Sequence, residues 1–207
     1  MMEDYARMTV KEFQTALSSS SPTPGGGSAA AITLGNAAAL TCMVCDLTIS
    51  KEKWKDGWED AEKIQLLAIP LFHDSLELAN KDAESFENVM KSWKLPKDSD
   101  EDKKIRANEI ETATINAALI PLETAKKASN LLELLPLLAE KGNSNAITDV
   151  AVAALLAHAA SSGALLNVRI NLLGLDKPEL SKSVAEISNK IEKNLAKTLE
   201  IVDKKLN

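Results

Sequence analysis

The chain has 207 residues, a formal net charge of −6 and a hydrophobic content of 45%, with only 3% aromatic residues. Nucleic acid is excluded as an expected partner, because binding to its phosphates needs clustered lysine and arginine, and this acidic chain shows no such patch. The apolar content is sufficient for a hydrophobic core, and its richness in alanine favours closely packed helices. No segment resembles a linker, so we expect one domain over residues 1–207.

The first predicted element is a short helix from about Thr9 to Leu17. Its pattern places Val10, Phe13 and Leu17 on one side. The residues before it are acidic and lack the apolar stretch of a signal peptide, which favours a cytoplasmic protein.

The most informative segment is the glycine-rich stretch Ser21-Pro-Thr-Pro-Gly-Gly-Gly-Ser28, which leads into an alanine-rich helix expected from about Ser28 to Ser50. Ser28 suits the N-cap of that helix. A glycine loop at a helix N-terminus exposes N–H groups that can hold phosphates, carboxylates or polar ligand edges. The spacing matches neither of the common nucleotide-binding glycine motifs. On spacing alone, a capped turn that lets helices pack closely and a ligand contact both fit.

Two features of this helix could suggest other functions. Its apolar run from Ala29 to Cys45 is interrupted by polar residues and is shorter than the ~20 residues of a membrane span. We therefore expect a buried helix and no membrane contact. Cys42 and Cys45 form a C-x-x-C pattern, but they lie inside a helical pattern and no second cysteine pair exists. Core cysteines and no metal site are expected.

The rest of the chain also has helical periodicity, and no segment alternates apolar and polar residues as strands do. We therefore expect an all-α fold, built as an up-and-down bundle of long helices. Pro70 is expected to bend one helix, and Pro121 and Pro136 are expected to kink or break another. The expected later helices span about residues 58–93, 100–141, 146–173 and 179–206.

The helix expected over residues 58–93 carries the clearest misfit, because Asp82 lies in its apolar stripe between Leu78 and Phe86. A carboxylate with apolar neighbours one turn away on each side should be desolvated, which raises its pKa and suits general acid–base catalysis. The alternative is that Asp82 hydrogen-bonds the end of a neighbouring helix. Lys97, just beyond the end of this helix, could meet an anionic substrate tail or could be a solvated loop lysine.

The helix expected over residues 146–173 carries three polar misfits, Asp149, Asn167 and Asn171. Asn167 and Asn171 lie one turn apart and can point at one ligand edge, or can bond neighbouring backbone as core amides. Asp149 near the helix start could instead be a cap. At ~1.5 Å per residue, roughly 27 Å separates Asp149 from Asn167, so they cannot share a compact site within one chain. One of them could serve a subunit interface, or the ligand could be long.

Five segments, taken in order along the chain, resemble the formiminotetrahydrofolate cyclodeaminase and methenyltetrahydrofolate cyclohydrolase family. They are Pro24-Gly-Gly-Gly-Ser28, Asp82-Ala-Glu-Ser-Phe86, Leu95-Pro96-Lys97, Gly142-Asn143 with Asp149, and Asn167-Val-Arg-Ile-Asn171-Leu. The resemblance covers about Thr9 to Leu206. It implies an all-α homodimer in which Asp82 takes the position of the family's catalytic aspartate. Where the bifunctional mammalian relatives carry a Ser-Asp pair after Gly-Asn, this chain has Thr148 and then Asp149.

The resemblance implies a tetrahydrofolate derivative as substrate, no bound cofactor, and one of two reactions. In cyclodeamination, nitrogen 10 of the folate attacks the formimino carbon on nitrogen 5 and ammonia is expelled. In cyclohydrolysis, water adds to the methenyl bridge and one carbon–nitrogen bond opens. Both need a proton shuttle at an amidine-like carbon, so Asp82 is expected as the general acid–base in either. The alternative of another class is a non-catalytic helical dimer that binds folate or acts as a scaffold. The residues expected to line or support the folate site are Gly25, Gly26, Gly27, Ser28, Lys97, Asn143, Asp149, Asn167 and Asn171.

Overall fold

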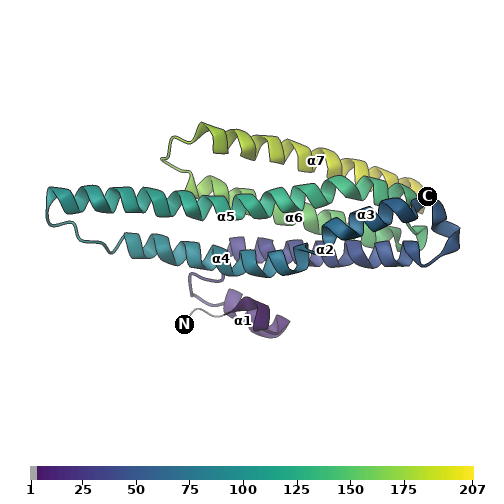
Figure 1. Cartoon of the computed structure of the whole chain (residues 1–207), viewed down its shortest axis with the longest axis horizontal. Coiled ribbons are helices and arrows are strands. Elements are labelled where there is room, and N and C mark those ends of the chain that lie inside the picture. The colour runs from purple at the N-terminus through teal and green to yellow at the C-terminus, as the bar shows by residue number, and fades with distance from the viewer. Residues whose placement is uncertain (1–3) are drawn as a thin grey trace.

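The structure, a computed structural model, describes residues 4–207, and these contain helices and no strand. The expected all-α fold is therefore confirmed. Its long helices run up and down along a common direction, and α7 lies on the opposite side of the bundle from α1 (Figure 1). The helices are η1 (Tyr5–Arg7), α1 (Val10–Leu17), α2 (Gly26–Ile49), η2 (Glu52–Gly57), α3 (Trp58–Ala68), α4 (Leu71–Ser92), α5 (Asp100–Lys141), η3 (Ser144–Ala146), α6 (Ile147–Asn171) and α7 (Pro178–Leu206).

Capping residues determine where two of these helices begin. Thr9 and Glu12 form a capping box at the start of α1, in which each side chain accepts a hydrogen bond from the other residue's backbone N–H. Ser99 and Asp102 form the same box at the start of α5. Both helix starts agree with the sequence-based bounds.

Pro70 has a different effect from Pro121 and Pro136. A bend is expected at Pro70, and the structure has a complete break there, between α3 and α4. Pro121 and Pro136 lie inside the unbroken α5, so the breaks expected there do not occur. Both of these prolines are buried, and the packing of the flanking turns compensates for the hydrogen bonds that proline removes.

The centre of the bundle is the antiparallel pair α2 and α6. α4 packs along α2, α5 packs along α6, and α7 covers α5 and α6. Small side chains dominate this core and let the helix axes approach closely, as the alanine content predicts. The largest apolar side chains that are almost completely buried are Leu34, Leu131, Leu132, Leu135 and Ile191.

The C-x-x-C pair belongs to this core, as expected. Cys42 and Cys45 are free and buried in α2. Burial raises the pKa of the Cys42 thiol to about 11 and that of Cys45 to about 12, so both stay protonated. Within residues 4–207, no group of three or more His, Cys, Asp and Glu side chains is placed to hold a metal ion.

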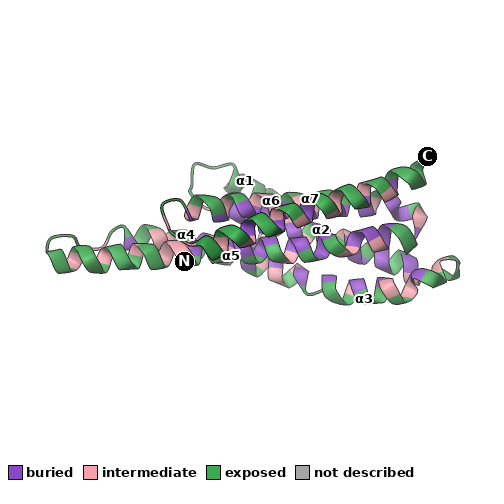
Figure 2. Cartoon of the chain, turned by 90° about the horizontal axis from the view of Figure 1, so that it is seen from above, coloured by how far each residue is buried: buried purple, intermediate pink, exposed green. Residues whose placement is uncertain are grey.

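α4 and α5 continue beyond the core as a two-helix arm, which ends at the loop between them (Figure 1). Most of this arm is exposed, in contrast to the buried centre of the bundle (Figure 2). The Arg106 guanidinium lies over the Trp93 ring at 5.0 Å and donates a hydrogen bond of 3.1 Å to the Trp93 carbonyl. This contact links the last turn of α4 to α5.

The two central helices are long and apolar enough to cross a membrane by length and composition alone. α2 spans 24 residues and the segment Ser144–Asn171 spans 28, each with a mean hydropathy of 1.5. The apolar run Ala29–Cys45 is shorter than a span, but the helix that contains it is not, so the length argument against a span does not hold for the whole of α2. Only 56% of the apolar window of α2 and 44% of that in the second segment are buried inside the bundle. A large part of two apolar helices thus remains uncovered in a single chain.

Candidate functional site

The first turn of α2 meets the middle of α4 at Asp82. Ser28 Oγ lies 3.0 Å from Asp82 Oδ2 and 3.1 Å from the Ala79 carbonyl oxygen, and it can donate its one proton to either. The Ser28 backbone N–H also hydrogen-bonds the Asp82 carboxyl group. Asp82 therefore satisfies the N-terminus of α2 from a neighbouring helix.

Ser28 has a different role from the one expected. The N-cap of α2 is Gly25, whose lack of a side chain leaves the cap without a side-chain hydrogen bond, and the helix begins at Gly26. Ser28 is the third helical residue and is completely buried. Its hydroxyl and its backbone N–H, which has no partner within the helix, both face the Asp82 carboxyl group of α4.

Gly27 is the glycine that allows this contact. A Cβ atom at Gly27 would overlap the carboxyl group of Asp82, whereas one at Gly25 would come no closer than 3.5 Å, to the Pro22 carbonyl oxygen. The absence of a side chain therefore permits close approach of the two helices at Asp82. The interpretation of the glycine stretch as a turn that lets helices pack closely is confirmed, whereas contact with a ligand stays a prediction.

Burial raises the pKa of Asp82 above its ordinary value, and the hydrogen bonds from the Ser28 hydroxyl and N–H lower it by a smaller amount. The predicted desolvation is confirmed on one side of Asp82, where Leu78 is buried. On the other side Phe86 is 39% exposed, so the apolar stripe of α4 emerges from the core just after Asp82. The carboxyl group is consequently half-buried and remains open to a ligand.

Asn167 lies beside the same helix start. A Cβ atom at Gly26 would come 3.4 Å from Asn167 Nδ2, which donates a 2.9 Å hydrogen bond to the Gly163 carbonyl. Asn171 Nδ2 donates a 2.9 Å hydrogen bond to the Ala117 carbonyl of α5. Both asparagines are half-buried, and their Oδ1 atoms accept no hydrogen bond from residues 4–207. They can therefore accept hydrogen bonds from a ligand.

Asn143 and Asp149 lie at the opposite end of α2. The Asn143 N–H donates to Thr48 Oγ1 at 2.9 Å, and its Nδ2 donates to the Leu47 carbonyl at 2.9 Å. Thr48 follows Ser28 by 20 helical residues, or about 30 Å at ~1.5 Å per residue. Asn143 thus joins the end of α2 to the turn before α6, far from Asp82 of the same chain.

Asp149 and Lys97 have free side chains. Asp149 is half-buried in the first turn of α6, where the helix dipole favours a carboxylate, but it makes no capping hydrogen bond and no ion pair with the described part of the chain. Lys97 is exposed in the loop at the tip of the arm, also without a partner among residues 4–207. Within one chain, the structure therefore gathers the glycines, Ser28, Asp82 and Asn167, and leaves Asn143, Asp149 and Lys97 elsewhere.

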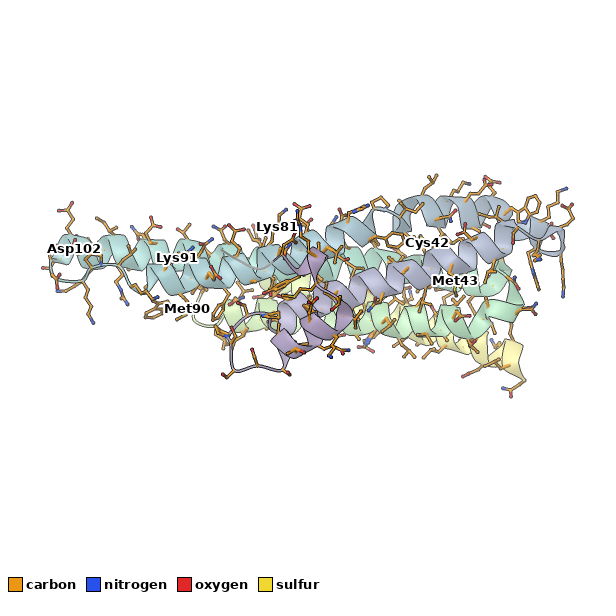
Figure 3. The ribbon with its side chains drawn as sticks, turned by 90° about the horizontal axis from the view of Figure 1, so that it is seen from below. Cys42, Met43, Lys81, Met90, Lys91 and Asp102 are labelled. Carbon is orange, nitrogen blue, oxygen red and sulfur yellow. The ribbon has the colours of Figure 1, made fainter. Side chains whose placement is uncertain are left out.

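Two neighbouring features were not predicted from the sequence. Asn80 accepts the Tyr5 N–H at 2.9 Å and donates to Asp4 Oδ1 at 2.8 Å, which ties the N-terminal segment to α4 two residues before Asp82. A groove of about 640 Å³ runs between α4 and α5, and its lining includes Lys81, the residue that precedes Asp82 in the sequence. Figure 3 labels Lys81 and Lys91, which line it, on α4. Its polar residues lie in the exposed arm, where polar side chains are ordinary and give no signal in the sequence. They include Ser85, Asn88, Glu109, Thr112 and Asn116.

Known proteins match this chain over most of its length. The family model described as formiminotransferase-cyclodeaminase matches residues 9–191. The methenyltetrahydrofolate cyclohydrolase of Methylorubrum extorquens is 40% identical over 168 residues, which cover 81% of each chain. The formimidoyltransferase-cyclodeaminase of Gallus gallus is 30% identical over 201 residues, which cover 93% of this chain but 36% of that protein. The chain thus spans most of the first relative and about a third of the second.

A solved structure has the same fold. The crystal structure of formiminotetrahydrofolate cyclodeaminase from Thermotoga maritima superposes with a TM-score of 0.81 and 31% sequence identity. The superposition covers 97% of this chain and 96% of that one. The helical arrangement described above is therefore that of a solved relative over nearly its whole length.

Proposed function

This chain belongs to the formiminotransferase-cyclodeaminase family, and we propose that it is a folate one-carbon enzyme acting at the level of 5,10-methenyltetrahydrofolate. It either opens the methenyl bridge by adding water or forms the bridge from a formimino group with release of ammonia. A relative named for the first reaction and one named for the second both match this chain over most of their length. One catalytic group can serve both reactions.

The observation that carries the proposal is the setting of Asp82. Its carboxyl group is held at the N-terminus of α2 by Ser28, is desolvated on one side and is open on the other. A raised pKa brings the protonated and ionised forms closer together in energy, as proton transfer in both directions requires. The methenyl bridge carries an amidinium charge, so a carboxylate beside it also stabilises the bound cation.

In hydrolysis, Asp82 takes a proton from the water that attacks the bridge carbon and returns it to the nitrogen whose bond to that carbon breaks. In cyclodeamination, nitrogen 10 attacks the carbon of the protonated formimino group, the Asp82 carboxylate accepts the proton that nitrogen 10 loses, and Asp82 then donates it to the nitrogen that leaves as ammonia. Asn167 offers its free amide oxygen at the same place and suits an N–H donor of the folate.

The enzyme acts as a homodimer. α2 and α6 are apolar on nearly all sides, as in buried helices, yet about half of each is uncovered in one chain. A second copy that covers these helices would account for their composition.

The assay follows the ultraviolet absorbance of the methenyl group with purified protein. Absorbance that rises from 5-formiminotetrahydrofolate identifies the cyclodeaminase, and faster decay of 5,10-methenyltetrahydrofolate identifies the cyclohydrolase. No change with either substrate would support the non-catalytic alternative. Asp82→Asn should abolish turnover while helicity stays intact, whereas Asp176→Asn, in the exposed loop before α7, should leave it unchanged. Turnover by Asp82→Asn near that of the parent would contradict the role of Asp82.

A further inference from the structure

The N-terminal segment, residues 4–17, lies outside the helical bundle (Figure 1). It comprises η1 and α1, and no residue of α1 is buried. Its first residues, 4–8, precede the part of the chain that the family model matches. The segment nevertheless makes specific contacts with α4 beside Asp82, and the proposed mechanism gives these contacts no role.

The anchor of this segment is the side-chain amide of Asn80. Asn80 Oδ1 accepts the Tyr5 N–H at 2.9 Å, and Asn80 Nδ2 donates to Asp4 Oδ1 at 2.8 Å. The amide thus uses an acceptor and a donor on two consecutive residues, which fixes both the position and the direction of the segment. The Asp4 carboxylate also accepts the Ala6 N–H at 3.1 Å and pairs with Arg7 at 3.2 Å, so its orientation is fixed.

The Tyr5 side chain packs in one cluster with residues of α2 and α4. It is 6% exposed, and its ring meets the Phe13 ring edge-on, with 5.7 Å between the ring centroids. The other buried residues of this cluster are Ala31 of α2 and Leu78, Ala79 and Ala83 of α4. Because alanine methyl groups are small, the Tyr5 ring and Leu78 supply most of the bulk that packs the two helices together here.

This cluster borders the contact between Ser28 and Asp82 on both helices. Ala79 and Ala83 lie three positions before and one position after Asp82. The Ala79 carbonyl oxygen lies 3.1 Å from Ser28 Oγ. Ala31 lies three positions after Ser28, which is about one helical turn. The N-terminal segment therefore supports the crossing of α2 and α4 at the level of the proposed catalytic group.

The two attachments lie on different flanks of α4. At 3.6 residues per turn, Asn80 and Asp82 project about 160° apart around the helix axis, and the surface of Ala79 and Ala83 lies between them. The N-terminal segment is bound at the Asn80 flank, and Ser28 of α2 is bound at the Asp82 flank. Release of the segment would therefore uncover the alanine surface beside the Ser28–Asp82 contact and admit water to it.

We propose that the N-terminal segment, anchored by Asn80, positions Asp82 for proton transfer. Asn80 and Tyr5 are positioning residues, which act by holding the first turn of α2 against α4 and so maintaining the Ser28–Asp82 contact. Neither residue is among those expected to contact folate. The inference rests on the proposed function for the reaction in which Asp82 takes part, whereas the contact itself can be measured without substrate.

The test exchanges the hydrogen-bond roles of residues 4 and 80. Asn80→Asp keeps an acceptor for the Tyr5 N–H, but it removes the donor and places a carboxylate against that of Asp4. Adding Asp4→Asn to this variant supplies the donor from the other side, which restores both hydrogen bonds and the net charge of the parent. Because both variants carry the same carboxylate at position 80, recovery in the double variant cannot come from removing it. Asn189→Asp, the same change at an exposed position of α7, is the matched control.

Hydrogen exchange followed by NMR measures the contact without any assay of activity. The Ser28 N–H has no partner within α2 and is hydrogen-bonded to Asp82, so its exchange rate reports this contact. Asn80→Asp should accelerate this exchange about tenfold or more, and the double variant should return it to about the parental rate. The Leu132 N–H, in the buried core of α5, should keep its parental rate in both. Equal acceleration at Ser28 and Leu132, or an unchanged rate at Ser28, would overturn the proposal.

Steady-state kinetics then test the effect on the reaction. Asn80→Asp should lower kcat about tenfold and leave KM within about twofold, and the double variant should recover at least about half of parental kcat. Asn189→Asp should match the parent. Parental kcat in Asn80→Asp, a loss confined to KM, or a slow double variant whose Ser28 exchange is restored would refute the positioning role. An inactive parent would instead count against the proposed function, and hydrogen exchange would still decide whether the segment holds the Ser28–Asp82 contact.

Discussion

Gly27 shows how one missing side chain can determine the position of the proposed catalytic group, Asp82. Asp82 occupies the space where a Cβ atom of residue 27 would lie. The Gly27→Ala change should therefore displace the carboxyl group and lower kcat/KM by about 10²-fold, the effect expected of a misplacement of ~1 Å. Stability should fall little, because the atoms that must move belong to the end of the half-buried Asp82 side chain and alanine is favoured over glycine in a helix by about 0.5–1 kcal/mol.

The matched control for this change is Gly25→Ala. A Cβ atom at Gly25 meets only the Pro22 carbonyl oxygen, at an ordinary contact distance of 3.5 Å. Kinetics and circular dichroism of both variants separate a local effect from unfolding. Parental turnover by Gly27→Ala would mean that Asp82 does not need this close approach.

Ionised Asp82 should also lower the free energy of unfolding, because burial raises its pKa in the folded protein. Between the unfolded and the folded pKa, the folded state binds more protons, so the free energy of unfolding decreases as the pH rises through this interval. Asp82→Asn removes the ionisation and should be at least as stable as the parent at pH 7. Its advantage should shrink as the pH falls toward the ordinary aspartate value. Urea unfolding of both proteins at several pH values measures this difference in stability. A difference that favours Asp82→Asn more at acid pH than at pH 7 would contradict the prediction.

Asp82 could be found from the sequence because a carboxylate within an apolar helical stripe is visible locally. Its hydrogen-bond partner could not, because Ser28 is 54 positions away and the contact depends on how α2 crosses α4. The partner of Asn143 could not be predicted either, because its hydrogen bond to the Leu47 carbonyl joins residues that are 96 positions apart. Local patterns thus indicated which groups are unusual, and tertiary packing determined what each one contacts.

At the level of elements, the crossing of α2 and α4 positions the site. A Cβ atom at Gly35 would overlap Ser75 Oγ, and Ser75 is buried. Gly35→Ala should therefore separate the two helices and destabilise the protein by about 1–3 kcal/mol, as overpacking of a core usually does.

Chemical denaturation compares this variant with Gly163→Ala. At Gly163 a Cβ atom would meet the Ala30 Cβ at 3.6 Å, which is an ordinary contact, so this control should be as stable as the parent or more stable. If both variants unfold at the parental midpoint, the α2–α4 crossing tolerates an extra methyl group and does not fix the position of Asp82.

The elements themselves were largely predictable, because helical periodicity and capping residues act over a few positions. The start of α5 follows from the Ser99–Asp102 capping box. The continuity of α5 through Pro121 and Pro136 did not follow, because whether a helix survives a proline depends on the packing of its neighbouring turns. Pro70 is expected to bend one helix, and in the structure it separates α3 from α4 completely.

For the whole molecule, the burial pattern separates two kinds of surface. The arm of α4 and α5 is largely exposed (Figure 2). The large exposed hydrophobic residues of α2 and α6 are Met43, Leu47, Val152, Leu155, Leu166 and Ile170. Water tolerates the first surface, but a large apolar face on a single chain marks an interaction site. The composition of α2 and α6 therefore suits both the core of one chain and the contact that the proposed homodimer requires.

Linkage between pairing and folding gives a prediction for the whole molecule. If the folded chains pair and the unfolded chains do not, each tenfold increase in protein concentration adds about 1.4 kcal/mol to the stability of the dimer. With ~2.1 cal/mol/K of unfolding entropy per residue over two chains, the melting temperature should rise on the order of 2 °C per tenfold increase. Leu155→Glu should melt at a lower temperature that does not change with concentration, because its charge keeps the α6 faces apart, and Leu66→Glu, which changes an exposed leucine of α3, should retain the parental slope. Calorimetry over a hundredfold range of concentration measures the slope, and a parent whose melting temperature is constant over this range folds as a monomer.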